Sequence, residues 1–156
     1  MRRVRQQLTE ADCAEILRTA ASGVLAVSGD GGYPYAVPMN FVWDGDRIYF
    51  HCAVSGHKLD AIRSDSRVSF CVVGMDKTVP ERFTSHYKSV IVFGRAEPVT
   101  DDAEKRSAVE KLAAKYSPDE SAQSRSAEID AFWDRLIMLR LSIEHMSGKQ
   151  AKELVE

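Results

Sequence analysis

The alternation of apolar and other residues over 137–143 predicts a half-buried β-strand. Ile137, Leu139, Leu141 and Ile143 are separated by residues that would face the opposite side of a sheet, because successive strand side chains point to opposite faces. Residues 68–73 form a nearly continuous apolar run, which also reads as a strand. Further strands are expected at 24–27, 35–43, 47–53 and 88–99, with a hairpin turn at 44–46.

Helical spacing replaces this alternation at several places. Val109, Leu112, Ala113 and Tyr116 recur at i, i+3, i+4 and i+7, the pattern of an amphipathic helix over 101–115. Another helix should begin after Thr9 and end by Gly23. Its first residues, Thr9-Glu10-Ala11-Asp12, approximate a capping box in which Asp12 replaces the usual glutamate. Shorter helices are expected over 56–63 and 127–136.

Proline and glycine mark the irregular places. Residues 75–86 are polar and interrupted by Pro80, so they are expected to form a loop. Pro38 lies inside a predicted strand, and this indicates an edge, a bulge or a break in pairing. Gly94 is a candidate bulge. Six or seven short strands with helices mostly at the ends indicate an α+β antiparallel barrel. No repeat or linker divides the chain, so residues 1–156 are expected to be one domain.

Composition and charge exclude several classes of protein. The net charge is −2, which gives no basic excess for a nucleic-acid partner. No apolar run approaches the roughly 20 residues that cross a bilayer, and the basic start lacks the apolar core of a secretory signal. Cys13, Cys52 and Cys71 are odd in number and widely spaced, which favours free thiols in a reducing, cytoplasmic compartment. Neither their spacing nor any carboxylate–histidine cluster indicates a metal site.

The segment Gly56-His57-Lys58 carries the clearest candidate chemistry. It lies where a predicted strand ends and a helix begins. A helix N-terminus presents unpaired N–H groups and a partial positive charge, which favour an anion such as phosphate. The alternative is that Lys58 is a solvated surface lysine and His57 an exposed loop residue.

Four segments together resemble a known family. They are YAVPMNF at 35–41, IYFHCA at 48–53, GHKLDAI at 56–62 and SGKQA at 147–151. In this order and spacing, over residues 9–152, the chain is similar to the FMN-binding split-barrel superfamily related to pyridoxamine 5′-phosphate oxidase. Within it, the chain most resembles the branch that includes the nitroimidazole-resistance proteins. The resemblance implies a six- or seven-stranded antiparallel split β-barrel with flanking helices, and a homodimer with one FMN at each interface.

The resemblance also implies which residues contact the cofactor. His57 and Lys58 would hold the FMN phosphate, and the backbone of 37–40 would face the flavin ring, where Pro38 leaves neighbouring groups unpaired. Lys88 and Ser89 would contribute from the partner subunit, although they could equally be surface strand residues. The expected cofactor contacts are Val37, Pro38, Met39, Asn40, His51, Cys52, Ala53, Gly56, His57, Lys58, Lys88 and Ser89.

His51 is the candidate catalytic residue. Alternation places it on the face opposite Phe50 and Cys52, and the resemblance puts this position beside the cofactor or substrate. It would hydrogen-bond the flavin or donate a proton near neutral pH. The alternative is a structural histidine.

The resemblance therefore implies an FMN-dependent oxidoreductase that reduces small electron acceptors, such as nitroaromatic compounds. A non-catalytic flavin protein for storage, sensing or delivery is the second reading, and a haem- or deazaflavin-binding split barrel is the third. No glycine-rich dinucleotide fingerprint is present. A nicotinamide donor would therefore have to bind without a Rossmann domain, which slightly favours the non-catalytic reading.

Overall fold

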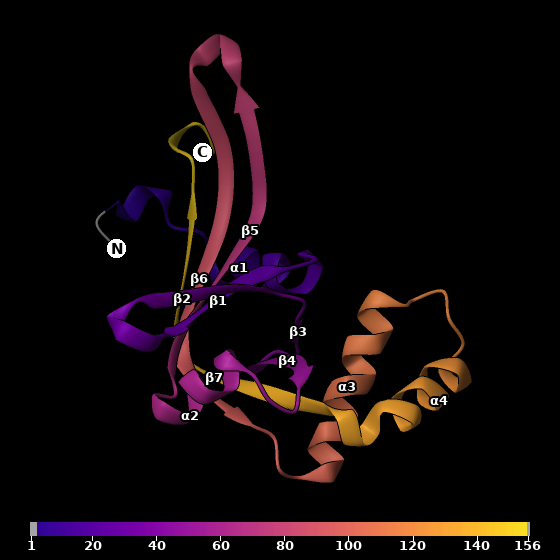
Figure 1. Ribbon diagram of the computed structural model, residues 1–156. Coiled ribbons are helices and arrows are strands. Elements are labelled where there is room, and N and C mark those ends of the chain that lie inside the picture. Colours follow the sequence, from indigo (N-terminus) through magenta and orange to yellow (C-terminus); the bar gives the residue numbers. More distant parts are fainter. Residues whose placement is uncertain (1–2, 156) are drawn as a thin grey trace.

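Seven antiparallel strands form one sheet in the computed structural model, which describes residues 3–155 (Figure 1). The strands lie in the order β2-β1-β5-β6-β7-β4-β3. The strands are β1 (Gly23–Ser28), β2 (Pro34–Met39), β3 (Val42–Trp43), β4 (Arg47–Ala53), β5 (Arg67–Val79), β6 (Thr84–Pro98) and β7 (Leu136–Gln150). The helices are α1 (Glu10–Thr19), α2 (His57–Ser64), α3 (Asp102–Tyr116) and α4 (Ala122–Phe132). The predicted α+β class and the split-barrel arrangement are confirmed.

The larger of two hydrophobic clusters lies inside the curled sheet, under α1 and α2. Phe41, Phe50 and Phe70 are fully buried there. The ring of Phe70 meets the other two edge to face, with centroids 5.0 and 4.9 Å apart, a geometry that aromatic quadrupoles favour. Leu59 and Ile62 of α2 reach the same cluster, which anchors the helix at the end of β4.

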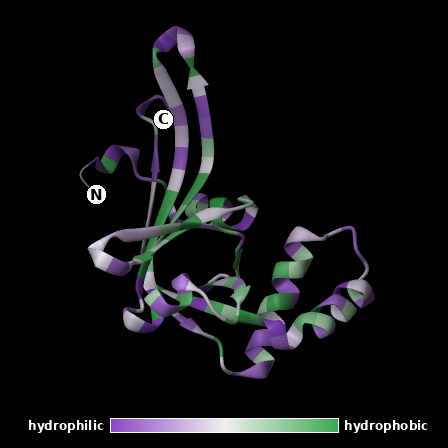
Figure 2. Ribbon diagram, in the orientation of Figure 1, coloured by the Kyte–Doolittle hydropathy of each residue, from purple (hydrophilic) through white to green (hydrophobic). Residues whose placement is uncertain are grey.

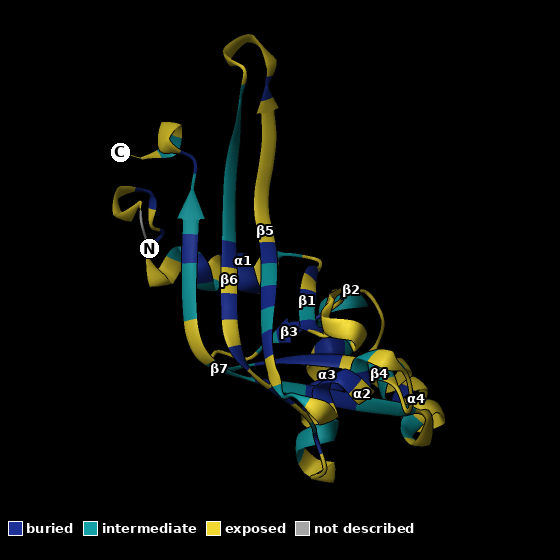
Figure 3. Ribbon diagram, turned by 60° about the vertical axis from the view of Figure 1, so that its left-hand side comes forward, coloured by how far each residue is buried: buried dark blue, intermediate teal, exposed yellow. Residues whose placement is uncertain are grey.

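The second cluster lies on the opposite face of β4 and β7, where α3 and α4 pack (Figures 1 and 3). Val109 and Leu112 supply the apolar side of α3, as its spacing predicts. Ile129 comes from α4 and Tyr49 from β4. The two helices therefore form a wall beside the sheet, and the end of β4 lies between this wall and α2.

Glu104 fixes α3 against the sheet. Its carboxylate accepts hydrogen bonds from the Tyr49 hydroxyl at 2.9 Å, from Arg47 at 3.2 Å and from Arg140 at 2.8 Å. Partial burial acts to raise the pKa of Glu104, but the bonds from Tyr49 and Arg140 outweigh it and hold the pKa below its usual range. The wall is thus tied to β4 and β7 by charge-assisted hydrogen bonds as well as by apolar packing.

The N-terminal capping box is confirmed with aspartate in the third position. The Thr9 hydroxyl accepts from the Asp12 N–H at 3.1 Å, and the Asp12 carboxylate accepts from the Thr9 N–H at 3.2 Å. Pro38 lies on β2, the edge strand next to β1, so the edge reading is correct. The register shift beside Gly94 confirms the bulge; a Cβ on this residue would lie 2.0 Å from the Ser142 carbonyl oxygen.

The expected loop over 75–86 is wrong. β5 continues to Val79 and β6 begins at Thr84, so these residues form a long hairpin that projects from the barrel, with hydrophilic colours along most of it (Figures 1 and 2). Its mostly polar sequence belongs to paired strands whose residues, apart from Val79, are exposed or half-buried, and not to a loop. Pro80 opens the three-residue turn at the tip, where its missing N–H costs no ladder bond.

Three other boundaries differ from expectation. The predicted strand over 35–43 is two strands, β2 and β3, separated at residues 40–41. α4 covers 122–132 rather than 127–136, because the Ser121 side chain caps it by accepting from the Ser124 N–H. β7 runs to Gln150 instead of ending at 143, so the segment 147–150 belongs to the strand and pairs with β6.

Candidate functional site

A small cavity of about 190 Å³ lies at the N-terminus of α2. The N-cap is Gly56, whose φ of +143° is in the region that favours glycine. The N–H groups of Leu59 and Asp60 bond the Gly56 carbonyl, while those of His57 and Lys58 precede the helical ladder. The cavity is lined by Tyr35, Cys52, Ala53, Ser55, Gly56, His57, Lys58 and Leu59. Its helix N–H groups, hydroxyl and ammonium are the donors that a phosphate group requires.

The two basic residues of this cavity differ in their surroundings. Lys58 is half-buried, and its Nζ lies 3.3 Å from the Met39 sulfur. His57 is exposed; its Nδ1 lies 3.5 Å from Asp30, and its ring meets the edge of Tyr35. The lysine has no carboxylate at this distance among the ion pairs of the described chain, so Lys58 offers the less neutralised positive charge.

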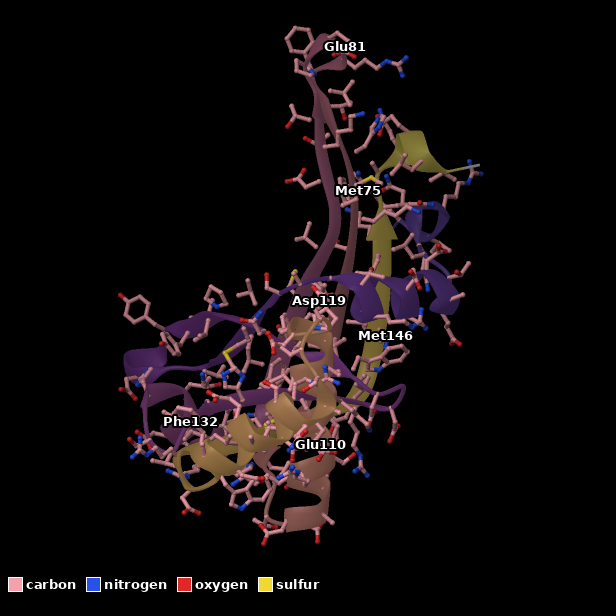
Figure 4. All side chains as sticks on the ribbon, turned by 90° about the vertical axis from the view of Figure 1, so that its right-hand side faces the viewer. Met75, Glu81, Glu110, Asp119, Phe132 and Met146 are labelled. Atoms are coloured by element: carbon pink, nitrogen blue, oxygen red, sulfur yellow. The ribbon has the colours of Figure 1, made fainter. Side chains whose placement is uncertain are left out.

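A larger cavity of about 440 Å³ lies between the end of β4 and the α3–α4 wall. Six of its lining side chains are apolar: Val109, Leu112, Ala113, Ile129, Phe132 and Leu136. Asn40, His51, Tyr116 and Glu128 supply the polar atoms. Phe132, labelled in Figure 4, is 45% exposed at the end of α4. An apolar cavity with a few polar groups is the usual form of a site for a small organic molecule.

His51 joins the two cavities along β4. It lines the apolar cavity, and the next two residues, Cys52 and Ala53, line the phosphate-sized one. As predicted, His51 is on the face opposite Phe50 and Cys52, which pack toward the barrel core. His51 is exposed at the rim of the cavity, but partial desolvation of its ring, and then the positive charge of Lys58, lower the pKa of His51. The neutral imidazole is therefore favoured near pH 7, suited to hydrogen bonding at the shared edge of the two cavities.

Acidification should destabilise the wild-type protein more than a His51→Gln variant. Because the folded-state pKa of His51 lies below its usual value, the unfolded chain takes up a proton first as the pH falls below about 6.5. The resulting loss of folding stability reaches its full value once the pH is below the folded-state pKa of His51. We expect equal pH dependence above pH 8 and a gap in Tm that widens from pH 7 to pH 5. Parallel Tm profiles across that range would contradict the prediction.

The segment 37–40 lies beside both cavities. Met39 is buried and touches the Lys58 ammonium, while Asn40 lines the apolar cavity and donates to the Ala21 carbonyl at 3.3 Å. Val37 packs against the barrel core, and Pro38 is exposed on the edge strand. The fold thus places three of the predicted cofactor-contact segments, 37–40, 51–53 and 56–58, in one region.

Lys88 and Ser89 lie elsewhere in the chain. They pair with Gln150 and Lys149 at the end of β7, whereas Ala53 pairs with Leu136 at its beginning. Lys88 and Ser89 are therefore not placed to contact the cofactor site of their own chain. Their predicted contact with the cofactor would have to be made from a second copy.

Sequence reasoning missed the walls of the apolar cavity. The helical spacing of Val109, Leu112 and Ala113 identified a buried face, but spacing does not say whether such a face packs fully or leaves a cavity. Phe132 and Ile129 line the cavity from α4, and the exposure of Phe132 is visible only where α3 and α4 are placed together.

The three cysteines of the chain differ in their burial. Cys13 is buried, Cys52 and Cys71 are half-buried, and all three are free, as predicted. Burial raises the pKa of the Cys52 thiol although Lys58 and Arg63 oppose it, so the phosphate-sized cavity contains a neutral thiol.

None of the helices within residues 3–155 is long and apolar enough to span a bilayer.

Comparison with known proteins gives both a family and a fold. A comparison with curated protein sequences found no match. Among solved structures, a proposed 5-nitroimidazole antibiotic resistance protein from Bacteroides thetaiotaomicron has a TM-score of 0.75 at 21% identity, covering 92% of this chain and 86% of its own. An FAD-binding protein from Mesorhizobium loti has a TM-score of 0.63 at 26% identity, with coverages of 94% and 98%. An FAD- and haem-binding protein from Mycobacterium smegmatis has a TM-score of 0.76 at 22% identity, with coverages of 95% and 74%.

The sequence model of one family matches nearly the whole chain. It is described as pyridoxamine 5′-phosphate oxidase, and it matches residues 9–150, a range that includes both cavities and every strand. The chain therefore belongs to the pyridoxamine 5′-phosphate oxidase family.

Proposed function

We propose that the protein binds FMN, one per subunit of a homodimer, and transfers electrons to small organic acceptors such as nitroaromatic compounds. The observation that carries this proposal is the pair of adjoining cavities along β4. One has the donors for the cofactor phosphate, and the other has apolar walls for the ring of an organic acceptor. When bound, the flavin would supply the redox chemistry, and the protein would supply binding, orientation and electrostatics.

The residues at α2 fit the phosphate of such a cofactor. The N–H groups of 57 and 58, the Lys58 ammonium and the Ser55 hydroxyl border one small cavity, and the helix N-terminus adds a partial positive charge. Residues 37–40 and 51–53 would border the rest of the cofactor. His51, neutral near pH 7, would orient the flavin or an acceptor by a hydrogen bond.

The comparisons support the same class of function. One structural neighbour is a proposed 5-nitroimidazole antibiotic resistance protein and two others bind FAD. On that basis we propose a flavin as the cofactor and nitroaromatic compounds as the acceptors of this chain. The three free cysteines fit a reducing, cytoplasmic location.

The outer face of the sheet is where we propose that a second copy binds. Pro38, Val24, Cys71 and Ile91 form one cross-strand row on this face. The apolar residues of this outer sheet face are Val24, Ala36, Pro38, Cys71, Val73, Ile91 and Phe93. Contiguous exposed apolar surface usually marks an interface. The face borders the segment 37–40, so a partner there would cover the edge of the cofactor site and bring its own Lys88 and Ser89 into range.

Flavin titration tests the proposal. The purified protein should bind about one FMN per subunit, and riboflavin should bind at least roughly tenfold more weakly, because it lacks the phosphate that makes charge-assisted bonds. FAD is titrated in parallel to determine which flavin binds more tightly. Equal affinity for FMN and riboflavin would contradict the assignment of the α2 cavity.

Two further readouts separate the other readings. A Soret band in the purified protein, in place of a flavin spectrum, would favour haem. Flavin that is reduced by light under anaerobic conditions and is not reoxidised by any nitroaromatic compound would favour a storage, sensing or delivery protein. That reading has in its favour the lack of a dinucleotide fingerprint for a nicotinamide donor.

A further inference from the structure

We propose that the apolar cavity takes an aromatic substrate that carries no phosphate or carboxylate group. This inference rests on the proposed function, since it names the substrate class for that site. Its basis is the lining of the cavity between β4 and the α3–α4 wall, which is defined by ten described residues.

The walls of the cavity suit a flat apolar ring. Leu112 and Ala113 come from α3, Ile129 and Phe132 from α4, and Leu136 from the start of β7. The volume of about 440 Å³ lies within the range of roughly 300–1,000 Å³ that is usual for small-molecule sites. Burying a ring against these side chains would be favoured by the hydrophobic effect, and Phe132 could stack on it.

The charges around the cavity disfavour an anion. Neither lysine nor arginine lines it, while the carboxylate of Glu128 does. His51 is neutral near pH 7, because burial and Lys58 lower its pKa. A substrate with a phosphate would therefore lose solvation here without gaining a cationic partner.

Cations carried by α3 and β7 are already engaged. Lys115 donates to the Phe41 carbonyl at 3.0 Å and lies over the Phe41 ring, 4.0 Å from its centroid. Lys105 donates to the Trp133 carbonyl at 2.8 Å. Arg140 pairs with Glu104 and Glu97. Lys58 belongs to the other cavity, where the cofactor phosphate would use its charge.

This arrangement makes the apolar cavity unsuited to pyridoxamine 5′-phosphate, the substrate that gives the family its name. Pyridoxamine 5′-phosphate carries a phosphate with close to two negative charges at neutral pH. In this protein the helix N-terminus and the ammonium group that suit a phosphate are at α2, and the cavity for a second molecule is lined by neither lysine nor arginine. This distribution gives one site with a cation for the cofactor phosphate and one site without a cation for the substrate.

Paired ligands that differ by one phosphate test the inference. FMN-loaded protein is titrated with 4-nitrobenzyl alcohol and with 4-nitrobenzyl phosphate, and binding is measured by calorimetry and by the change in the flavin spectrum. We expect the alcohol to bind at least tenfold more tightly. Equal or tighter binding of the phosphate, or no binding of either ligand, would overturn the inference.

A charge placed in the cavity provides the matched variant. Ala113→Lys should reduce the preference for the alcohol by about tenfold, because it gives the phosphate a cationic partner. Ala103→Lys adds the same charge to the exposed first turn of α3, outside the lining residues, and should leave the preference unchanged. Should Ala113→Lys fail to fold, Glu128→Gln at an exposed position should shift the preference in the same direction by a smaller factor. Unchanged preference in a folded cavity variant would contradict the assignment.

Failure of this inference can be distinguished from failure of the proposed function. If FMN does not bind, the proposed function fails, and the same ligands are titrated into the unloaded protein in excess inorganic phosphate to occupy the α2 cavity. A preference for the alcohol there would leave the substrate class standing, and its absence would remove it as well.

Discussion

Replacing Lys58 by methionine should weaken FMN binding by roughly tenfold to a hundredfold, since a charge-assisted hydrogen bond is worth about 1.5–3 kcal/mol. Lys58 lies in the first turn of α2 and lines the cavity that fits a phosphate. Methionine keeps the apolar stem that lies near Met39 and removes the ammonium. The loss should shrink at high salt because ions screen the pair. Fluorescence quenching of FMN at two salt concentrations measures both effects.

The stability of the unliganded variant should stay level or rise slightly. A positive charge in the first turn of a helix opposes the helix dipole, so its removal does not weaken α2. Arg63→Met removes a positive charge from the last turn of the same helix and should leave FMN affinity nearly unchanged. Riboflavin affinity should be insensitive to Lys58→Met. Unchanged FMN affinity would make Lys58 a surface lysine, and a collapse of the unliganded fold would give it a structural role.

Local patterns predicted the elements near the cofactor site well. Gly56 caps α2 and His57 and Lys58 begin it, as expected, because the glycine lets the chain turn after β4 and Leu59 and Ile62 then follow at helical spacing, which buries both in the core. The alternation that placed His51 opposite Phe50 holds for the same reason: one face of β4 covers the barrel core. These features depend on neighbours within a few positions in the sequence.

Features that depend on distant segments were not predictable in this way. Residues 75–79 and 84–88 are mostly polar, and apart from Val79 they are exposed or half-buried, so their pairing into a projecting hairpin is set by backbone hydrogen bonds that leave no clear hydrophobic pattern. The apolar cavity forms only where α3, α4 and β4 meet. The spacing of apolar residues within one helix does not predict the space that remains between two helices. The distance between Lys88 and Ala53 follows from the length of β7, whose last residues the alternation at 137–143 does not reach.

A charged residue in the outer sheet face should separate the proposed dimer. Ile91 lies on β6 between Cys71 of β5 and Ser147 of β7, and it is exposed in the single chain. In a two-fold interface each substitution occurs on both copies. An unpaired buried charge costs about 3 kcal/mol or more, so Ile91→Asp should raise the dimer Kd by on the order of 10⁴-fold.

Sedimentation velocity at micromolar protein concentration measures this effect. The wild type should sediment as a dimer and Ile91→Asp as a monomer with an unchanged circular dichroism spectrum, because the side chain is outside the core of its own chain. Val4→Asp, at an exposed apolar position near the N-terminus, is the matched control and should remain dimeric. FMN affinity should fall in the monomeric variant, since the outer sheet face borders residues 37–40 and the partner would supply Lys88 and Ser89. A wild-type monomer in the FMN-loaded state, or a dimeric Ile91→Asp, would rule out this interface. A monomeric variant with full FMN affinity would instead place the whole cofactor site within one chain.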